Sequence, residues 1–175
     1  MMRTTGTCVC FLALGLVVQA GNAPSTAVVK RLAQELGTAT IRGEYGKVID
    51  GTYEKIVQEM GGREKAIKVI ESGMRKLRAK GITFKAYKVG DPGDFHREGN
   101  NTFVVVPTVL EMSAPGNKLI AKSYLLGISG DGGKNWKFVD GAGMDKQEVR
   151  ERVLPKLPAK LKLPAKEAPK VVSEK

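Results

Sequence analysis

The sequence predicts an α+β fold in which helices come first and a long-stranded antiparallel sheet follows. Helical periodicity runs from about Pro24 to Lys80, whereas Thr102–Met112 and Lys118–Ser129 are two long apolar strands. The turn Ser129–Trp136 follows these strands and leads to a third strand, Lys137–Asp140. A run of helices followed by a run of strands is typical of α+β domains and not of folds in which helices and strands alternate.

Three helices are expected before the sheet. The first begins at Pro24, because proline is tolerated at the first helical position, and its apolar residues recur at helical spacing. These residues are Val28, Val29, Leu32, Leu36 and Ala39. The second runs from about Tyr45 to Met60 and bends around Gly51, and the third is Arg63–Lys80. The third helix is amphipathic, with an apolar face formed by Ala66, Ile67, Ile70, Met74 and Leu77.

The remaining elements follow from alternation and turn residues. Ile82–Val89 alternates well enough for a strand, and the polar, glycine-containing segment Asp91–Asn101 is expected as a loop or irregular hairpin. Pro115–Asn117 joins the two long strands as a hairpin turn. Asp145 with Glu148 has the spacing of a helix capping box, which predicts a last short helix that ends near residue 154.

Both long strands are apolar on both faces, so the sheet needs two covers. In the first strand, one face carries Val104, Val106, Leu110 and Met112, and the other carries Phe103, Val105 and Val109. The three helices can cover only one face. The other cover is either a second protomer or the C-terminal segment, so a homodimer through the sheet is one expectation.

The first twenty residues have the pattern of a secretory signal. Arg3 gives a positive start, Cys8–Val18 is an apolar run of eleven residues, and Ala20 ends a small-residue exit. A bilayer-spanning helix needs about 20 apolar residues. We expect cleavage near Ala20 and a secreted or periplasmic protein, with an uncleaved anchor as the alternative. Cleavage removes both cysteines and therefore any disulfide or thiolate chemistry.

The chain is basic, with a formal net charge of +11. Residues 155–175 are rich in Pro, Lys and Ala, which predicts an extended, disordered and solubilising tail. The alternative is weak electrostatic contact of this tail with anionic surfaces. We expect no nucleic-acid partner, because export separates the protein from most nucleic acid and no aromatic residue follows Phe138. A metal site is not expected, since His96 is the only histidine.

Four segments within about residues 25–142 resemble sequences of the nuclear transport factor 2-like superfamily. They are Gly43–Asp50, Tyr53–Val57, Gly61–Ile67 and Ser129–Asp140. The chain is most similar to small secreted bacterial members. The resemblance implies that residues 21–154 form a cone, in which the sheet wraps around the helices and leaves a pocket at its open end. Members include isomerases, dehydratases, polyketide cyclases and non-catalytic binding modules, so the fold does not select a function.

Asp140 is the candidate catalytic residue. By strand alternation Trp136, Phe138 and Asp140 share one face, where a carboxylate held in an apolar pocket would have a raised pKa. This resembles the general base of steroid-isomerase-like members, with Tyr53 as the candidate hydrogen-bond donor. The alternative is that Asp140 and Gly141 only turn the chain after the strand.

The pocket is expected to be lined by six residues: Tyr45, Tyr53, Tyr124, Trp136, Phe138 and Asp140. Ser129, Asp131, Gly133 and Trp136 match an Asp-box turn, which in a single copy predicts a structural hairpin. The function expected first is a secreted, non-catalytic domain that binds a small apolar molecule or a protein partner, as a homodimer and without a cofactor. The alternative is an isomerase, dehydratase or cyclase that uses Asp140 as its base.

Overall fold

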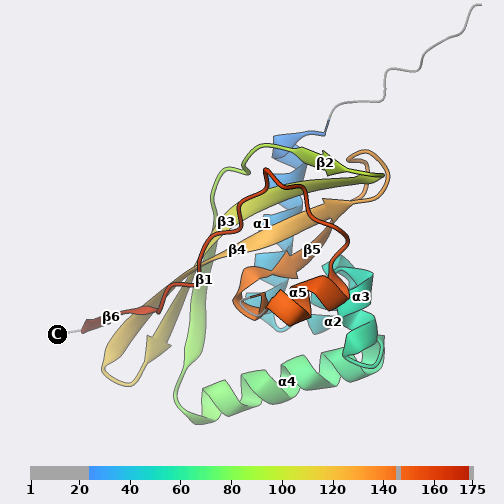
Figure 1. The fold of residues 1–175 in the computed structure, drawn as a ribbon. Coiled ribbons are helices and arrows are strands. Elements are labelled where there is room, and N and C mark those ends of the chain that lie inside the picture. Colours follow the sequence, from blue (N-terminus) through green and yellow to red (C-terminus); the bar gives the residue numbers. More distant parts are fainter. Residues whose placement is uncertain (1–23, 145–146, 174–175) are drawn as a thin grey trace, which may run out of the picture.

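The computed structural model describes residues 24–144 and 147–173, and in them the chain is an α+β protein. Figure 1 shows helices beside a strongly curved, open sheet. The helices are α1 (Thr26–Arg42), α2 (Tyr45–Gly51), α3 (Glu54–Glu59), α4 (Arg63–Ala79) and α5 (Gln147–Val153), with a 3-10 turn, η1 (Gly141–Gly143), before α5. The strands are β1 (Thr83–Val89), β2 (His96–Glu98), β3 (Asn101–Ala114), β4 (Asn117–Ser129), β5 (Lys137–Asp140) and β6 (Lys170–Ser173).

The sheet has six strands, and every strand pairing in it is antiparallel. The strand order is β1-β3-β4-β5, with β2 also paired to β3 and β6 also paired to β4. The central hairpin stays in register from the pair Thr102 and Ser129 to the pair Ala114 and Asn117. The predicted α+β class with a curved antiparallel sheet is therefore confirmed, and so is the hairpin turn.

The predicted second helix is two helices, α2 and α3. Thr52 lies between them in an extended conformation and forms a bridge with Phe138 of β5, and the backbone N–H of Tyr53 donates to the Phe138 carbonyl at 2.9 Å. This contact at the edge of β5 interrupts the helix. Gly51 is closely packed there, because a Cβ at this position would lie 2.5 Å from Leu36.

Helix α1 covers the face of the sheet that we call the inner face. Its fully buried side chains Val29 and Ala33 pack against the inner-face cluster Val104, Val106, Leu125, Trp136 and Phe138. The helix lies close to β1, where an added Cβ on Gly37 would be 2.0 Å from the ring of Tyr87. Glycine at this position therefore permits the close approach of helix and sheet.

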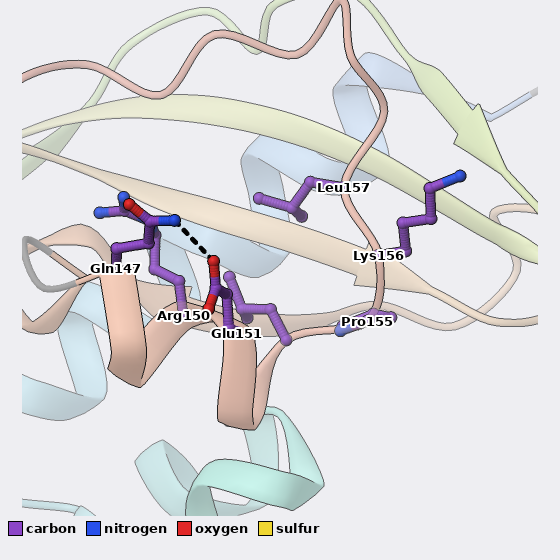
Figure 2. A pocket seen from close by; sticks show the side chains of 7 residues that line it. Gln147, Arg150, Glu151, Pro155, Lys156 and Leu157 are labelled. Carbon is purple, nitrogen blue, oxygen red and sulfur yellow. Dashed lines mark hydrogen bonds between the residues drawn. The ribbon is translucent and has the colours of Figure 1, made fainter.

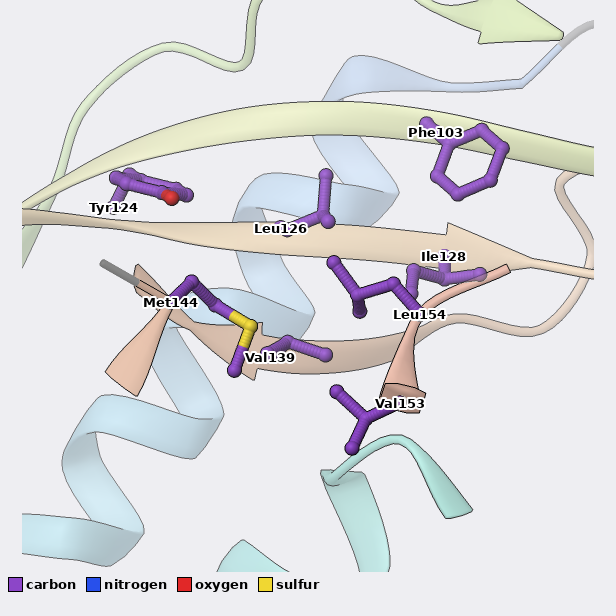
Figure 3. Close-up of a cluster of buried hydrophobic side chains, with 8 residues drawn as sticks. All are labelled: Phe103, Tyr124, Leu126, Ile128, Val139, Met144, Val153 and Leu154. Carbon is purple, nitrogen blue, oxygen red and sulfur yellow. The ribbon is translucent and has the colours of Figure 1, made fainter. Parts of the chain in front are cut away.

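The other face, the outer face, is covered by the C-terminal part of the chain. Figure 3 shows Met144, Val153 and Leu154 packed on the outer-face side chains Phe103, Tyr124, Leu126, Ile128 and Val139. Of the two covers left open by the sequence, the C-terminal segment is the one found on this part of the sheet.

Residues 155–173 differ from the solvated tail expected from their composition. Leu157, Leu161 and Leu163 are partly buried against the outer-face cluster, and the chain then pairs with β4 as β6. The prolines keep the segment extended, as expected, but its leucines lie on an apolar surface that would otherwise face water. Asp145 lies outside the described residues, so the predicted capping box is not tested.

Helix α4 is the least covered of the long elements. Its main contacts are with α2 and α3, and in Figure 1 it lies along one end of the molecule. Only Ala66 is buried, and the other residues of its predicted apolar face are half-buried: Ile67, Ile70, Met74 and Leu77. Within the described part of the chain, no helix has the length and apolarity needed to cross a bilayer.

Candidate functional site

An apolar pocket of about 180 Å³ lies between α1, α2 and β5 on the inner face. We call it the inner pocket. Its apolar walls come from Leu32, Leu36 and Ala39 of α1 and from Trp136 and Phe138. Gly51 completes the wall, and Glu35 and Lys47 add the charged groups.

The side chains in each wall of the inner pocket share one face of their helix or strand because of their spacing in the sequence. Leu32, Leu36 and Ala39 have the i, i+4, i+7 spacing that places residues on one side of a helix. Trp136 immediately precedes β5 and Phe138 is the second residue of that strand, so the two side chains face the same side of the sheet.

Trp136 is held in a defined orientation. Its indole Nε1 donates a hydrogen bond to the Gly133 carbonyl at 3.0 Å, and its ring lies 5.7 Å from the ring of Phe95 at an angle of 38°. Only 5% of the residue is exposed. A buried indole with its polar group already bonded offers an apolar wall to a ligand.

The turn before Trp136 is the structural hairpin that the Asp-box pattern predicts. Asp131 Oδ1 accepts the backbone N–H groups of Lys134 at 3.1 Å and Asn135 at 2.9 Å, and the Ser129 hydroxyl at 2.7 Å. These hydrogen bonds hold the pKa of Asp131 well below its usual range, and the bond from the Asn135 backbone N–H has the largest effect. The turn therefore positions Trp136 through contacts of its own.

The charged groups of the inner pocket have partners in the protein. The Glu35 carboxylate accepts a hydrogen bond from Arg31 at 2.6 Å, and Lys47 forms an ion pair with Glu44 at 2.7 Å. The inner pocket is thus an apolar space that no unpaired charge enters. Such a site favours an uncharged, apolar molecule.

Asp140 lies on the same face as Phe138 but outside the inner pocket. Its Oδ1 accepts the backbone N–H of Ala142 at 2.8 Å, which caps η1, and its carboxylate also accepts from Ser123. Desolvation raises the pKa of Asp140, and these two hydrogen bonds oppose the rise, although the residue keeps contact with solvent. The bond to Ala142 matches the alternative prediction, in which Asp140 turns the chain.

Two further polar groups lie near Asp140 on the inner face. Thr108 is paired with Ser123 in the register of β3 and β4, and it hydrogen-bonds Tyr87 of β1. Burial raises the pKa of Tyr87 to about 12, and the Thr108 bond opposes that rise. The tyrosine in the electrostatic surroundings of Asp140 on this face is Tyr87, not the predicted donor Tyr53. Sequence reasoning missed it because strand alternation alone does not show which residues pair.

The remaining predicted pocket residues lie elsewhere. Tyr45, the first residue of α2, is 7% exposed, and its hydroxyl accepts a hydrogen bond from Arg78 of α4 at 3.0 Å. Tyr53 and Tyr124 pack in the outer-face cluster. Of the six predicted residues, the structure therefore brings only Trp136 and Phe138 together in the inner pocket.

A larger cavity, of about 520 Å³, lies beside α5 on the outer side of the molecule (Figure 2). Its polar side chains already have partners. Gln147 donates to Glu151 at 2.6 Å, Arg150 donates to the Met144 carbonyl at 2.6 Å, and Lys156 forms an ion pair with Glu98. None of the predicted site residues lines this cavity. The inner pocket, which Trp136 and Phe138 line, is therefore the candidate site.

No known protein family, curated protein or solved structure matches this chain. Within residues 24–144 and 147–173, no group of three His, Cys, Asp or Glu side chains is placed to hold a metal ion.

Proposed function

We propose that this protein is an exported, nuclear transport factor 2-like cone domain that binds a small apolar molecule in the inner pocket. The observation that supports binding is the apolar cavity in which Trp136 and Phe138 face the leucines of α1. The order of helices followed by a curved, open antiparallel sheet supports the cone assignment. The signal-like pattern of residues 1–20 supports export.

The size of the inner pocket limits the ligand to about one aromatic ring. Its volume is about 180 Å³, and an apolar cavity of about 150 Å³ holds benzene. Burying about 150–200 Å² of such a ligand at ~25 cal/mol per Å² contributes about 4–5 kcal/mol, which corresponds to a Kd in the millimolar to high micromolar range. Ligands are therefore best titrated into the millimolar range.

Two other expectations from the sequence, the homodimer through the sheet and the enzyme, receive less support. A homodimer through the sheet would need apolar surface on the outer face, where Leu157, Leu161 and Leu163 already lie. An isomerase, dehydratase or cyclase would need the Asp140 carboxylate free to take a proton, and this group instead caps η1. The geometry favours a binding domain over the enzyme, and it favours the C-terminal segment over a second protomer as the cover of the outer face.

Binding can be measured through tryptophan fluorescence, because Trp136 is the single tryptophan of the chain. The probe is 4-bromobenzyl alcohol, whose bromine quenches an indole in contact with it. We expect saturable quenching with a Kd near 1 mM, an order of magnitude set by the buried area. Linear quenching without saturation would contradict the proposal, because it would show only collisions.

A cavity-filling substitution provides the specific test. Leu36→Phe places a larger side chain in the inner pocket and should weaken binding by about tenfold or more. The matched control is Val69→Phe, which adds a ring on the exposed side of α4 and should leave the Kd unchanged. Equal affinity of Leu36→Phe and wild type, with both proteins folded by thermal unfolding, would overturn the assignment of the ligand to this pocket.

A further inference from the structure

Helix α4 carries a large share of the positive charge of the protein. Residues 63–80 contain seven Lys or Arg against two Glu, a net charge of +5 out of +11 for the whole chain. Two of these cations are engaged: Arg63 with the Asp50 carboxylate at 2.7 Å, and Arg78 with the Tyr45 hydroxyl. The other five have no ion pair or hydrogen bond from their side chains in the described part of the chain: Lys65, Lys68, Arg75, Lys76 and Lys80.

An exposed apolar side chain lies among these free cations. Val69 is 56% exposed, and it is separated from Lys65 by four residues and from Lys76 by seven. At helical spacing all three lie on one side of α4. Ile70 and Met74, next to this side, are only half-buried. We call the five free cations together with Val69 the α4 surface.

A second exposed apolar site lies beyond the C-terminal end of α4. Val171 is 64% exposed and Val172 is 45% exposed, and both are in β6. Strand β6 pairs with the residues of β4 next to the hairpin turn. Pro115 in that turn lies against Gly81, just after α4, where an added Cβ would be 2.9 Å from the proline ring. Figure 1 shows the hairpin turn and β6 at the lower left, beyond the C-terminal end of α4.

We infer that the α4 surface docks onto an anionic lipid bilayer. Cations on a helix attract anionic headgroups, and apolar side chains among them gain free energy by entering the interface. A second copy of the chain is disfavoured, because two helices of net charge +5 repel each other. A polyanion such as a nucleic acid would use the cations but would leave Val69 in water.

An acidic protein partner fits less well than a bilayer. The exposed valines occur at two separate places, on α4 and on β6, with the hairpin turn between them. The free cations surround Val69, and Lys170 precedes Val171, so each apolar place has positive charge beside it. Buried apolar area and electrostatic attraction to anionic lipid both strengthen the binding of a protein to a membrane surface, and these two places offer both.

The experiment is co-sedimentation of the full chain with vesicles. Vesicles of equal parts phosphatidylglycerol and phosphatidylcholine are compared with vesicles of phosphatidylcholine alone, which also measure any contribution from the apolar run Cys8–Val18. We expect at least 100-fold stronger binding to the anionic vesicles at about 0.1 M salt, and most of this difference should vanish at about 1 M salt because the charges are screened.

Two variants with the same loss of charge separate the α4 surface from the overall charge. The test variant is Lys65→Gln, Lys68→Gln, Arg75→Gln and Lys76→Gln. The control is Lys122→Gln, Lys134→Gln, Lys160→Gln and Lys162→Gln, all exposed and all outside α4. Each cation near an anionic surface strengthens binding about fivefold, so the test variant should bind the anionic vesicles about 100-fold or more weakly. The control should lose less than about tenfold.

A third variant tests the apolar part of the α4 surface. Val69→Ser should weaken binding by several-fold, and this loss should persist at high salt because it does not depend on charge. Circular dichroism and thermal unfolding show whether each variant is folded, which is expected because the substituted side chains are exposed.

Several results would overturn the inference. Equal losses in the test and control variants would assign vesicle binding to the overall charge of the protein. Binding to soluble polyphosphate without binding to vesicles would assign the α4 surface to a polyanion. A change of oligomeric state in the test variant alone would assign it to contact between copies of the chain.

Discussion

The cover formed by the C-terminal segment gives the most direct test of the fold. Leu157, Leu161 and Leu163 are partly buried on the outer-face cluster, although their surroundings in sequence are those of a solvated tail. Replacing all three by alanine keeps the chain length and the prolines and removes only this contact. The tail prediction implies no change in stability, whereas the structure implies a clear loss.

The size of the loss can be worked out from the burial. Full burial of a leucine contributes about 1.5–3 kcal/mol, so three partly buried leucines together contribute about 2–4 kcal/mol. Small domains have a free energy of unfolding of about 5–15 kcal/mol, so this is a considerable fraction. With a urea dependence of about 2 kcal/mol per M, the unfolding midpoint should fall by about 1–2 M.

The assay is urea unfolding followed by circular dichroism. The matched control replaces three exposed residues of the same segment by alanine: Lys160, Lys162 and Glu167. We expect the control to stay within about 0.5 kcal/mol of wild type. If the leucine variant unfolds at the same midpoint as this control, the C-terminal segment does not cover the sheet in solution. Deleting residues 155–175 should destabilise further and promote self-association through the uncovered face.

Two further predictions concern the inner face and the charge of Asp140. Gly37→Ala should lower the free energy of unfolding by about 1–3 kcal/mol, because the added Cβ would lie 2.0 Å from Tyr87. Gly73→Ala has no atom within 4 Å of the added Cβ and should raise the free energy of unfolding by about 0.5–1 kcal/mol. Urea midpoints that shift in the same direction for both variants would contradict this packing. Because the folded-state pKa of Asp140 is raised, its ionisation lowers stability as pH rises through that pKa. The stability of Asp140→Asn should therefore rise relative to wild type as the pH increases from about 4, the ordinary pKa of an aspartate, through the raised pKa of the folded state, and a constant difference in unfolding midpoint would refute this.

Much of the fold follows from local patterns in the sequence. The two long strands and the turn between them were predictable, because two apolar runs separated by the turn residues Pro115, Gly116 and Asn117 are typical of a β-hairpin. The split between α2 and α3 was not, because it depends on Thr52 meeting Phe138 from a distant part of the chain. Local periodicity carries no information about such contacts.

The C-terminal segment shows where composition misleads. Proline and lysine are typical of solvated chain, and they outnumber the leucines in residues 155–175. The position of each leucine becomes informative only when a partly uncovered apolar sheet is known to lie nearby. The sequence did indicate that such a face existed, and it left the C-terminal segment as one of its two possible covers.

The candidate site was predictable in part. Alternation along β5 placed Trp136 and Phe138 on one face, and helical spacing placed Leu32 and Leu36 on one side of α1. That these two sets meet in one pocket depends on how α1 crosses the sheet, which the sequence pattern does not encode. In the same way, the pairing of Thr108 with Ser123 beside Asp140 depends on strand register.

The late position of the outer-face cover affects how the protein is made. Both long strands of the sheet are complete once Ser129 has been synthesised, but Leu163 follows thirty-four residues later. At about 5–20 residues per second, a nascent chain passes roughly 2–7 s with this apolar surface uncovered. During that interval the growing chain is most prone to aggregate and is most readily bound by chaperones. The folded state reaches its full stability only after Leu157, Leu161 and Leu163 have been added and have covered the outer face.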